Sequence, residues 1–169
     1  MEIPLGHGEL MWSPKLEARV LQELQLKKTD KVLEVGTGSG YLTALLASRA
    51  AHVHSVDCVA EFIPAAAKKL AAQDMSNISL EIGDGVGGWP SQGPYDAIVM
   101  TGSLPMLPDS LPRQLNPHGG RLIVILGEGP VMAATLITGV APNAFRHTVL
   151  FETQVKALQH APLPERFEF

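Results

Sequence analysis

A cluster of glycines between a predicted strand and a predicted helix constrains this chain more than any other sequence feature. The strand is predicted at 31–35, the loop carries Gly36, Gly38 and Gly40, and a helix is predicted at 41–49. Glycines let the backbone turn tightly and approach a ligand closely, beside the N-terminus of the following helix. The order strand, glycine loop, helix therefore predicts a nucleotide-like ligand bound to an α/β domain.

Short β-rich runs alternate with helical stretches along the rest of the chain. Ser13 and Pro14 are typical of a helix start. Strands are predicted at 52–57, 78–82, 95–100 and 121–126, and helices at 60–73 and 111–115. Further β-like runs at 133–138, 148–155 and 166–169 could close an antiparallel edge. We therefore predict an α/β fold with a doubly wound, mostly parallel sheet, and we place the continuously apolar strand 95–100 near its centre.

Composition and length limit the class of protein. The 169 residues are 46% hydrophobic and 18% charged, which predicts a single globular domain over 1–169. Cys58 is the only cysteine, so we expect no internal disulfide and take the cytoplasm as the default compartment. The net charge is −4 with dispersed basic residues, and apolar runs fall short of the roughly 20 residues of a membrane span. We expect neither nucleic acid nor a membrane as a partner.

Two aspartates follow predicted strands that neighbour the glycine loop. Asp57 ends the strand 52–57, where a carboxylate can accept hydrogen bonds from both ribose hydroxyls of an adenosine group. Asp84 stands between Gly83 and Gly85 and can reach an adenine amino group. The glycine spacing argues against a dinucleotide, because the third glycine of that pattern would fall on Tyr41. The sequence predicts that both carboxylates face one adenosine-type ligand.

Several segments between about residue 3 and 126 form a pattern when taken in order: Pro4-Leu5-Gly6-His7-Gly8, the run from Val32 to Tyr41, Val56-Asp57, Gly83-Asp84-Gly85, Trp89-Pro90, Tyr95 to Ile98, and Leu115 to Gly120. In order and spacing they resemble the protein-L-isoaspartate O-methyltransferase family. The Gly-His-Gly segment and the Gly-Asp-Gly followed by Trp-Pro are the more specific matches. The resemblance implies a Rossmann-like methyltransferase that transfers a methyl group from S-adenosyl-L-methionine to the free carboxylate of isoaspartyl residues in damaged protein.

The resemblance also implies which residues meet the cofactor. We expect contacts from Glu34, Gly36, Thr37, Gly38, Ser39, Gly40, Asp57, Cys58, Asp84, Gly85 and Thr101. Glu34 could hold the glycine loop from beneath, but we favour a position facing the sulfonium and amino groups of the cofactor. Thr101 could equally belong to a turn.

Two departures from the family pattern affect the catalytic residues. Family members usually carry some fifty residues before Gly-His-Gly; here that segment is absent and the chain begins in sequence that reads as a loop. The serine regarded as the family's active-site residue falls on Trp12, and Ser13 lies one position later. Trp12, Ser13 and His7 are therefore the catalytic candidates, although Ser13 could simply cap a helix, Trp12 could pack under the rim, and His7 could occupy a turn.

Other functions stay open at this point. A methyltransferase with a different acceptor and a cofactor-binding module without catalysis both fit the sequence, whereas an NAD-dependent oxidoreductase is disfavoured by the glycine spacing. No metal site is expected, since His52 and His54 share one strand face without a matching third ligand. The sequence does not predict an oligomeric state.

Overall fold

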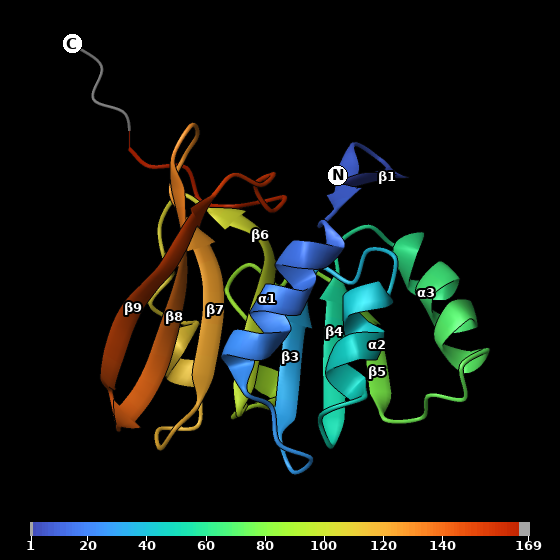
Figure 1. The fold of residues 1–169 in the computed structure, drawn as a ribbon, viewed down its shortest axis with the longest axis horizontal. Coiled ribbons are helices and arrows are strands. Elements are labelled where there is room, and N and C mark those ends of the chain that lie inside the picture. The colour runs from blue at the N-terminus through green and yellow to red at the C-terminus, as the bar shows by residue number, and fades with distance from the viewer. Residues whose placement is uncertain (1, 166–169) are drawn as a thin grey trace.

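A seven-stranded sheet forms the centre of the computed structural model, which describes residues 2–165 (Figure 1). The strands are β3 Lys31–Val35, β4 His52–Asp57, β5 Ile78–Ile82, β6 Ala97–Leu104, β7 Arg121–Leu126, β8 Met132–Ala141 and β9 Ala144–Thr153, in the order β5-β4-β3-β6-β7-β8-β9. Strands β3 to β7 pair in parallel, and β8 and β9 extend the sheet in antiparallel fashion. The predicted α/β fold with an antiparallel C-terminal edge is confirmed, and β6 is central and largely buried, as predicted.

Two helices cover one face of the sheet. Helix α1 (Pro14–Leu24) packs against β7, and α2 (Tyr41–Ala47) packs against β4; both lie in front of the sheet in Figure 1. Val20 and Leu24 of α1 share a buried core with strand residues such as Val32. Helix α3 (Phe62–Ala71) lies beside β5 and buries the apolar stripe Phe62, Ala66 and Leu70. These stripes at helical spacing explain why the sequence located the helices.

The other sheet face is covered mainly by connections between strands. The strand side chains that point to this face alternate along each strand with those of the first face. A second buried core forms on them and includes Tyr95, Leu104, Leu111 and Leu115. The connections contain two short 3₁₀ helices, η1 (Pro90–Gln92) and η2 (Pro112–Gln114). The short helix expected at 111–115 is the 3₁₀ helix η2, which ends where Leu115 becomes extended and bridges to Tyr95.

The N-terminal segment is a β-hairpin rather than the expected loop. β1 (Ile3–Gly6) pairs antiparallel with β2 (Glu9–Met11), and the turn passes through Gly6, His7 and Gly8, all with positive φ. Two glycines and a histidine that adopts φ 54° make this tight reversal possible. The hairpin lies above the end of the sheet where the parallel strands terminate (Figure 1).

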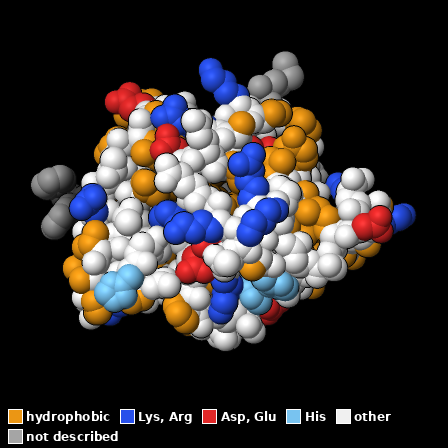
Figure 2. Space-filling view, turned by 60° about the horizontal axis from the view of Figure 1, so that its bottom comes forward, with side chains coloured by type: hydrophobic (Ala, Val, Ile, Leu, Met, Phe, Trp, Pro, Cys, Tyr) orange, Lys and Arg blue, Asp and Glu red, His pale blue; other side chains and the backbone are white. Residues whose placement is uncertain are grey.

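The C-terminal part differs from the prediction mainly in extent. The runs expected at 133–138 and 148–155 belong to the longer strands β8 and β9, which form one hairpin. The run at 166–169 lies outside the described residues. None of the helices in residues 2–165 is long and apolar enough to cross a membrane. On the face in Figure 2, Lys and Arg side chains are interspersed with acidic, histidine and apolar side chains.

Candidate functional site

A cavity opens where the parallel strands end, between the glycine loop, the N-terminal hairpin and the segment that follows β9. Its walls include Leu5, Leu10, Met11, Trp12, Glu17, Val35, Gly36, Thr37, Gly38, Ser39, Asp57, Cys58, Phe62, Gly83, Asp84, Gly85, Thr101, Lys156 and Gln159. Most of the predicted cofactor contacts therefore surround one space. Open α/β sheets bind ligands at this edge.

The glycine loop has a conformation that only glycine tolerates at its first position. Gly36 has φ +100°, and a Cβ atom there would lie 2.0 Å from Oγ1 of Thr101. That hydroxyl donates to the carbonyl oxygens of Val35 and Gly36, at 2.8 and 3.0 Å. Thr101 thus fixes the loop while also lining the cavity. Gly40 is not among the lining residues; it precedes α2 with φ 82°.

Asp57 joins the end of β4 to the glycine loop. Its Oδ2 accepts from the backbone N–H of Gly38 at 2.9 Å and its Oδ1 from that of Val59 at 2.8 Å. The residue is 7% exposed. Each carboxylate oxygen has two acceptor sites, so capacity for ligand hydroxyls is left on both oxygens.

Asp84 occupies the open side of the same cavity. Its side chain is 54% exposed, its Oδ1 accepts from the N–H of Val86 at 3.0 Å, and its Oδ2 lies 3.5 Å from Nδ1 of His160. The neighbouring Gly85 leaves no room for a side chain, because a Cβ there would approach Val35 to 2.9 Å. Asp57 and Asp84 therefore face one cavity from two adjacent strand ends.

Glu34 lies beneath the glycine loop and not on the cavity wall. Its Oε1 accepts from Thr43 at 2.5 Å and from Ser55 at 2.6 Å, and Ser55 in turn contacts the Thr37 hydroxyl at 2.6 Å. Its Oε2 is buried without a hydrogen-bond partner in the described part of the chain. Burial raises the pKa of Glu34 to about 8, although the two hydroxyls act in the opposite direction. Glu34 thus supports the loop through Ser55 and Thr37, and direct contact with a cofactor stays a prediction.

A second buried carboxyl, Glu17 of α1, was missed by the sequence analysis. It is 3% exposed, lines the cavity, and has an Oε2 atom without a partner within residues 2–165. Burial raises its pKa to about 7. The available signal was its spacing, since Glu17 precedes the buried Val20 and Leu24 by three and seven residues and so shares their helix face.

Comparison with known proteins places the chain. A family model described as Protein-L-isoaspartate(D-aspartate) O-methyltransferase (PCMT) matches residues 1–141. The chain belongs to this protein-L-isoaspartate O-methyltransferase family. Protein-L-isoaspartate O-methyltransferase 1 of Nitrosospira multiformis is 42% identical over 135 residues, which cover 80% of this chain and 56% of the relative. A relative from Yersinia pestis is 44% identical over 126 residues, covering 75% of this chain and 60% of the relative. The chain thus spans somewhat more than half the length of these relatives.

Solved structures support the same assignment of fold. A protein-L-isoaspartate O-methyltransferase superposes with a TM-score of 0.80 and 25% identity, covering 93% of this chain and 51% of that one. A Plasmodium falciparum protein described as a putative member of the family, in complex with S-adenosyl-L-homocysteine, gives a TM-score of 0.75 at 21% identity, covering 94% and 79% of the two chains. The Rossmann-like methyltransferase fold is confirmed.

The three catalytic candidates occupy different places in this family member. Trp12 is 5% exposed and forms part of both the cavity wall and the core. Ser13 caps α1, its hydroxyl oxygen accepting from the N–H of Leu16 at 3.4 Å, and it is not among the lining residues. His7 lies in the hairpin turn with its ring edge-on to Phe62 at 5.6 Å. Of the three, only Trp12 borders the cavity, and catalytic roles for all three stay predictions.

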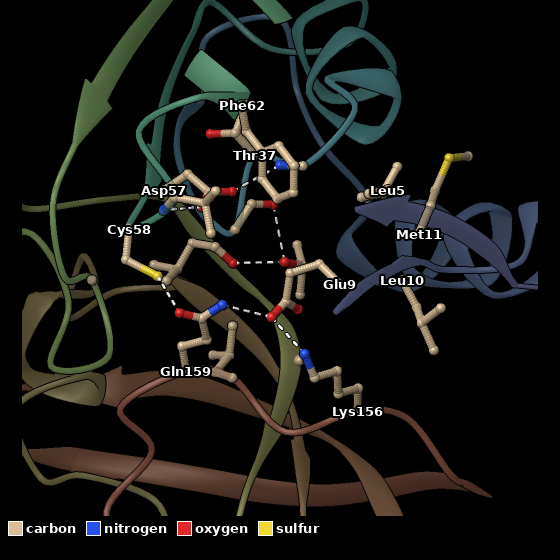
Figure 3. Close-up of a pocket in the computed structure, with 18 of the residues that line it drawn as sticks. Leu5, Glu9, Leu10, Met11, Thr37, Asp57, Cys58, Phe62, Lys156 and Gln159 are labelled. Carbon is tan, nitrogen blue, oxygen red and sulfur yellow. Dashed lines mark hydrogen bonds and ion pairs between the residues drawn. The ribbon is translucent and has the colours of Figure 1, made fainter. Parts of the chain in front are cut away.

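Residues from the C-terminal segment close over the cavity, and the sequence analysis did not identify them. Lys156 contacts Oε1 of Glu9 at 2.6 Å, and Gln159 donates to the same oxygen at 2.7 Å (Figure 3). The amide oxygen of Gln159 accepts from the Cys58 thiol at 3.6 Å. Burial raises the pKa of that thiol. No short-range pattern connects these residues, because Glu9 and Gln159 meet only through the folded chain.

His52 and His54, which the sequence placed on one face of a strand, lie side by side on β4. The His52 and His54 rings lie 4.6 Å apart on β4, as their spacing predicted. Nε2 of His52 pairs with the Ser79 hydroxyl at 2.8 Å. Within residues 2–165, no group of three or more His, Cys, Asp or Glu side chains is arranged to hold a metal ion.

Proposed function

We propose that this chain binds S-adenosyl-L-methionine and methylates the free carboxylate of isoaspartyl residues in protein or peptide substrates. The observation that carries this proposal is the shared cavity of Gly36–Ser39, Asp57 and Asp84 in a chain of this family. The relatives named above carry the isoaspartate methyltransferase name, and one structural neighbour holds the demethylated form of the cofactor.

The residues present fit an adenosyl cofactor. A Cβ atom would collide with Thr101 at Gly36 and with Val35 at Gly85, so the backbone that lines the cavity here accepts only glycine. Asp57 retains acceptor capacity for ribose hydroxyls, and Asp84 at the open side can accept from an adenine amino group. The cofactor, when bound, supplies a methyl group on a positively charged sulfur. The protein's task is to hold that group toward the acceptor and to exclude competing water.

The acceptor carboxylate needs to be positioned by the protein but does not need to be deprotonated by it. A carboxyl group with an ordinary pKa near 4 is ionised at neutral pH, so it reacts without a general base. Positioning of the two reacting atoms at about 3–3.5 Å can account for several kcal/mol of the barrier reduction. The seating of Ser13 as a helix cap is compatible with this chemistry, because no proton has to be removed. Trp12, as part of the wall, would set the width available to the acceptor.

The test is methyl transfer from radiolabelled S-adenosyl-L-methionine to a synthetic isoaspartyl peptide, with the aspartyl isomer as control. Incorporation into the isoaspartyl peptide alone supports the proposal. Equal inactivity on both peptides, with cofactor binding intact by calorimetry, would reject the acceptor. Failure to bind the cofactor would reject the proposal as a whole.

A further inference from the structure

The buried carboxyl of Glu17 lines the cavity. Only 3% of the residue is exposed, and its Oε2 has no hydrogen-bond partner among the residues described. An unsatisfied buried carboxyl oxygen destabilises a fold, because the atom loses its hydrogen bonds to water and gains none in exchange. Such a group is rarely kept in the first turn of a helix for stability alone, since an apolar side chain would pack there at no such cost.

A second unsatisfied oxygen lies in the same layer. Glu34 projects from β3 toward the side of the sheet that α1 and α2 cover, as its bond to Thr43 of α2 shows. Its Oε2 also has no hydrogen-bond partner among residues 2–165. Glu17 is close enough for its negative charge to raise the pKa of Glu34. The two carboxyl groups therefore lie near each other. Within residues 2–165, neither forms an ion pair with a lysine or arginine side chain.

Asp57 and Asp84 line the cavity where β4 and β5 end. Glu17 and Trp12 line the wall formed by α1 and the segment before it. If adenosine lies between the aspartates, the methionine part of the donor extends along the glycine loop toward that wall. That part carries an α-ammonium group with three N–H donors.

We propose that Glu17 binds the α-ammonium group of the methyl donor's methionine moiety. This inference rests on the proposed function, because it takes the donor to be S-adenosyl-L-methionine. The ammonium fits better than the sulfonium, which has no hydrogen to donate to an unsatisfied oxygen. The buried carboxyl of Glu17 makes binding of the donor sensitive to pH.

The sign of that sensitivity follows from the charges. Burial raises the Glu17 pKa to about 7, so near neutrality the empty site is partly protonated. A bound cation favours the ionised carboxylate, and binding then releases protons and tightens as pH rises toward 8. Other charged groups on the cavity wall are Glu2, Glu9, Asp57, Asp84 and Lys156, and Lys156 is paired with Glu9.

The experiment compares three ligands in wild type and Glu17→Gln by calorimetry at pH 6 and pH 8. S-adenosyl-L-methionine and S-adenosyl-L-homocysteine both carry the ammonium, whereas 5′-methylthioadenosine has the adenosine and sulfur without the amino acid. At pH 8 we expect Glu17→Gln to weaken the first two by about tenfold and to leave 5′-methylthioadenosine unchanged. Wild type and variant should differ less at pH 6, where Glu17 is largely neutral in the empty site. Glu152→Gln, an exposed change of the same type on β9, should match wild type throughout.

Three results would overturn the inference. Equal weakening of all three ligands indicates that Glu17 only shapes the cavity. Weakening of S-adenosyl-L-methionine alone assigns Glu17 to the sulfonium instead. Unchanged affinity for all three shows that the carboxyl makes no contact. If wild type binds none of the three, the proposed function itself has failed, which separates the two conclusions.

Discussion

The carboxylate of Asp57 accepts a hydrogen bond from the backbone N–H of Gly38 at 2.9 Å, so the end of β4 holds the glycine loop that follows β3. The same side chain also accepts from Val59 at the start of the next connection. One residue thereby fixes two segments that line the cavity.

Replacing Asp57 with asparagine should weaken binding of S-adenosyl-L-methionine by tenfold or more. The amide keeps the size but loses the charge, and hydrogen bonds to charged groups contribute about 1.5–3 kcal/mol each. Calorimetry measures the loss, with the exposed Asp109→Asn as control. Unaltered binding in Asp57→Asn would remove this residue from the cofactor site.

Gly36→Ala should abolish cofactor binding and destabilise the fold for two reasons. The backbone at residue 36 has a positive φ, which alanine adopts only with strain, and the new Cβ would collide with Thr101. Gly119→Ala is the matched control, since Gly119 has φ +92° but open space around its missing Cβ. We expect about 1 kcal/mol of lost stability in the control from conformation alone, and about 1–3 kcal/mol more at Gly36. Chemical denaturation gives both values; equal losses would mean that the Thr101 contact is unimportant.

The empty protein should lose stability as pH rises from about 5 to 8. The folded pKa of Glu17 is about 7 and that of Glu34 about 8, above their ordinary 4.5, so the folded state binds more protons than the unfolded state in this window. For Glu17 the shift from 4.5 to about 7 corresponds to at most about 3 kcal/mol.

Glu17→Gln tests that assignment directly. Because glutamine is neutral and of the same size, the variant should lose less stability than wild type between pH 5 and 8 and should be the more stable of the two at pH 8. Urea unfolding across the pH range measures both. A variant that is less stable than wild type at pH 8 would show that the carboxylate is compensated in the fold.

Cys58 offers a probe of the cavity because it is the only thiol. Burial raises its pKa, so alkylation by iodoacetamide at pH 8 should be slower in the native protein than in urea. S-adenosyl-L-homocysteine should slow it further, since Cys58 lines the cavity. Mass spectrometry measures the labelled fraction. An alkylation rate that is the same with and without S-adenosyl-L-homocysteine would place the cofactor elsewhere.

The ion pair between Arg121 and Asp30 should matter far more than the one on the surface of α1. Nη2 of Arg121 lies 2.5 Å from Oδ2 of Asp30, and the side chains are 16% and 7% exposed. Asp30→Ala leaves a largely buried cation unpaired and should cost about 3 kcal/mol. Glu23→Gln, which breaks the exposed pair with Arg19, should cost less than about 1 kcal/mol. Similar costs by urea unfolding would contradict this ranking.

The sequence by itself determined the order of the strands and helices of the main sheet along the chain, and it located the glycine loop at a strand end. Apolar stripes such as Phe62, Ala66 and Leu70 located the helices, and glycines beside a strand end located the loop. These signals are local, because helix and strand periodicity and turn chemistry depend on near neighbours in the chain.

Only the tertiary structure decided which side chains share the cavity. In the folded chain Ser13 caps α1, Glu34 lies beneath the glycine loop, and the first residues form a hairpin. Glu9 contacts Lys156 and Gln159, although nearly the whole chain separates them in sequence. The tertiary structure also buried Glu17 and left its Oε2 without a hydrogen-bond partner within residues 2–165. Such pairings depend on packing between segments far apart in sequence, and no local pattern encodes which buried polar atom is left unsatisfied.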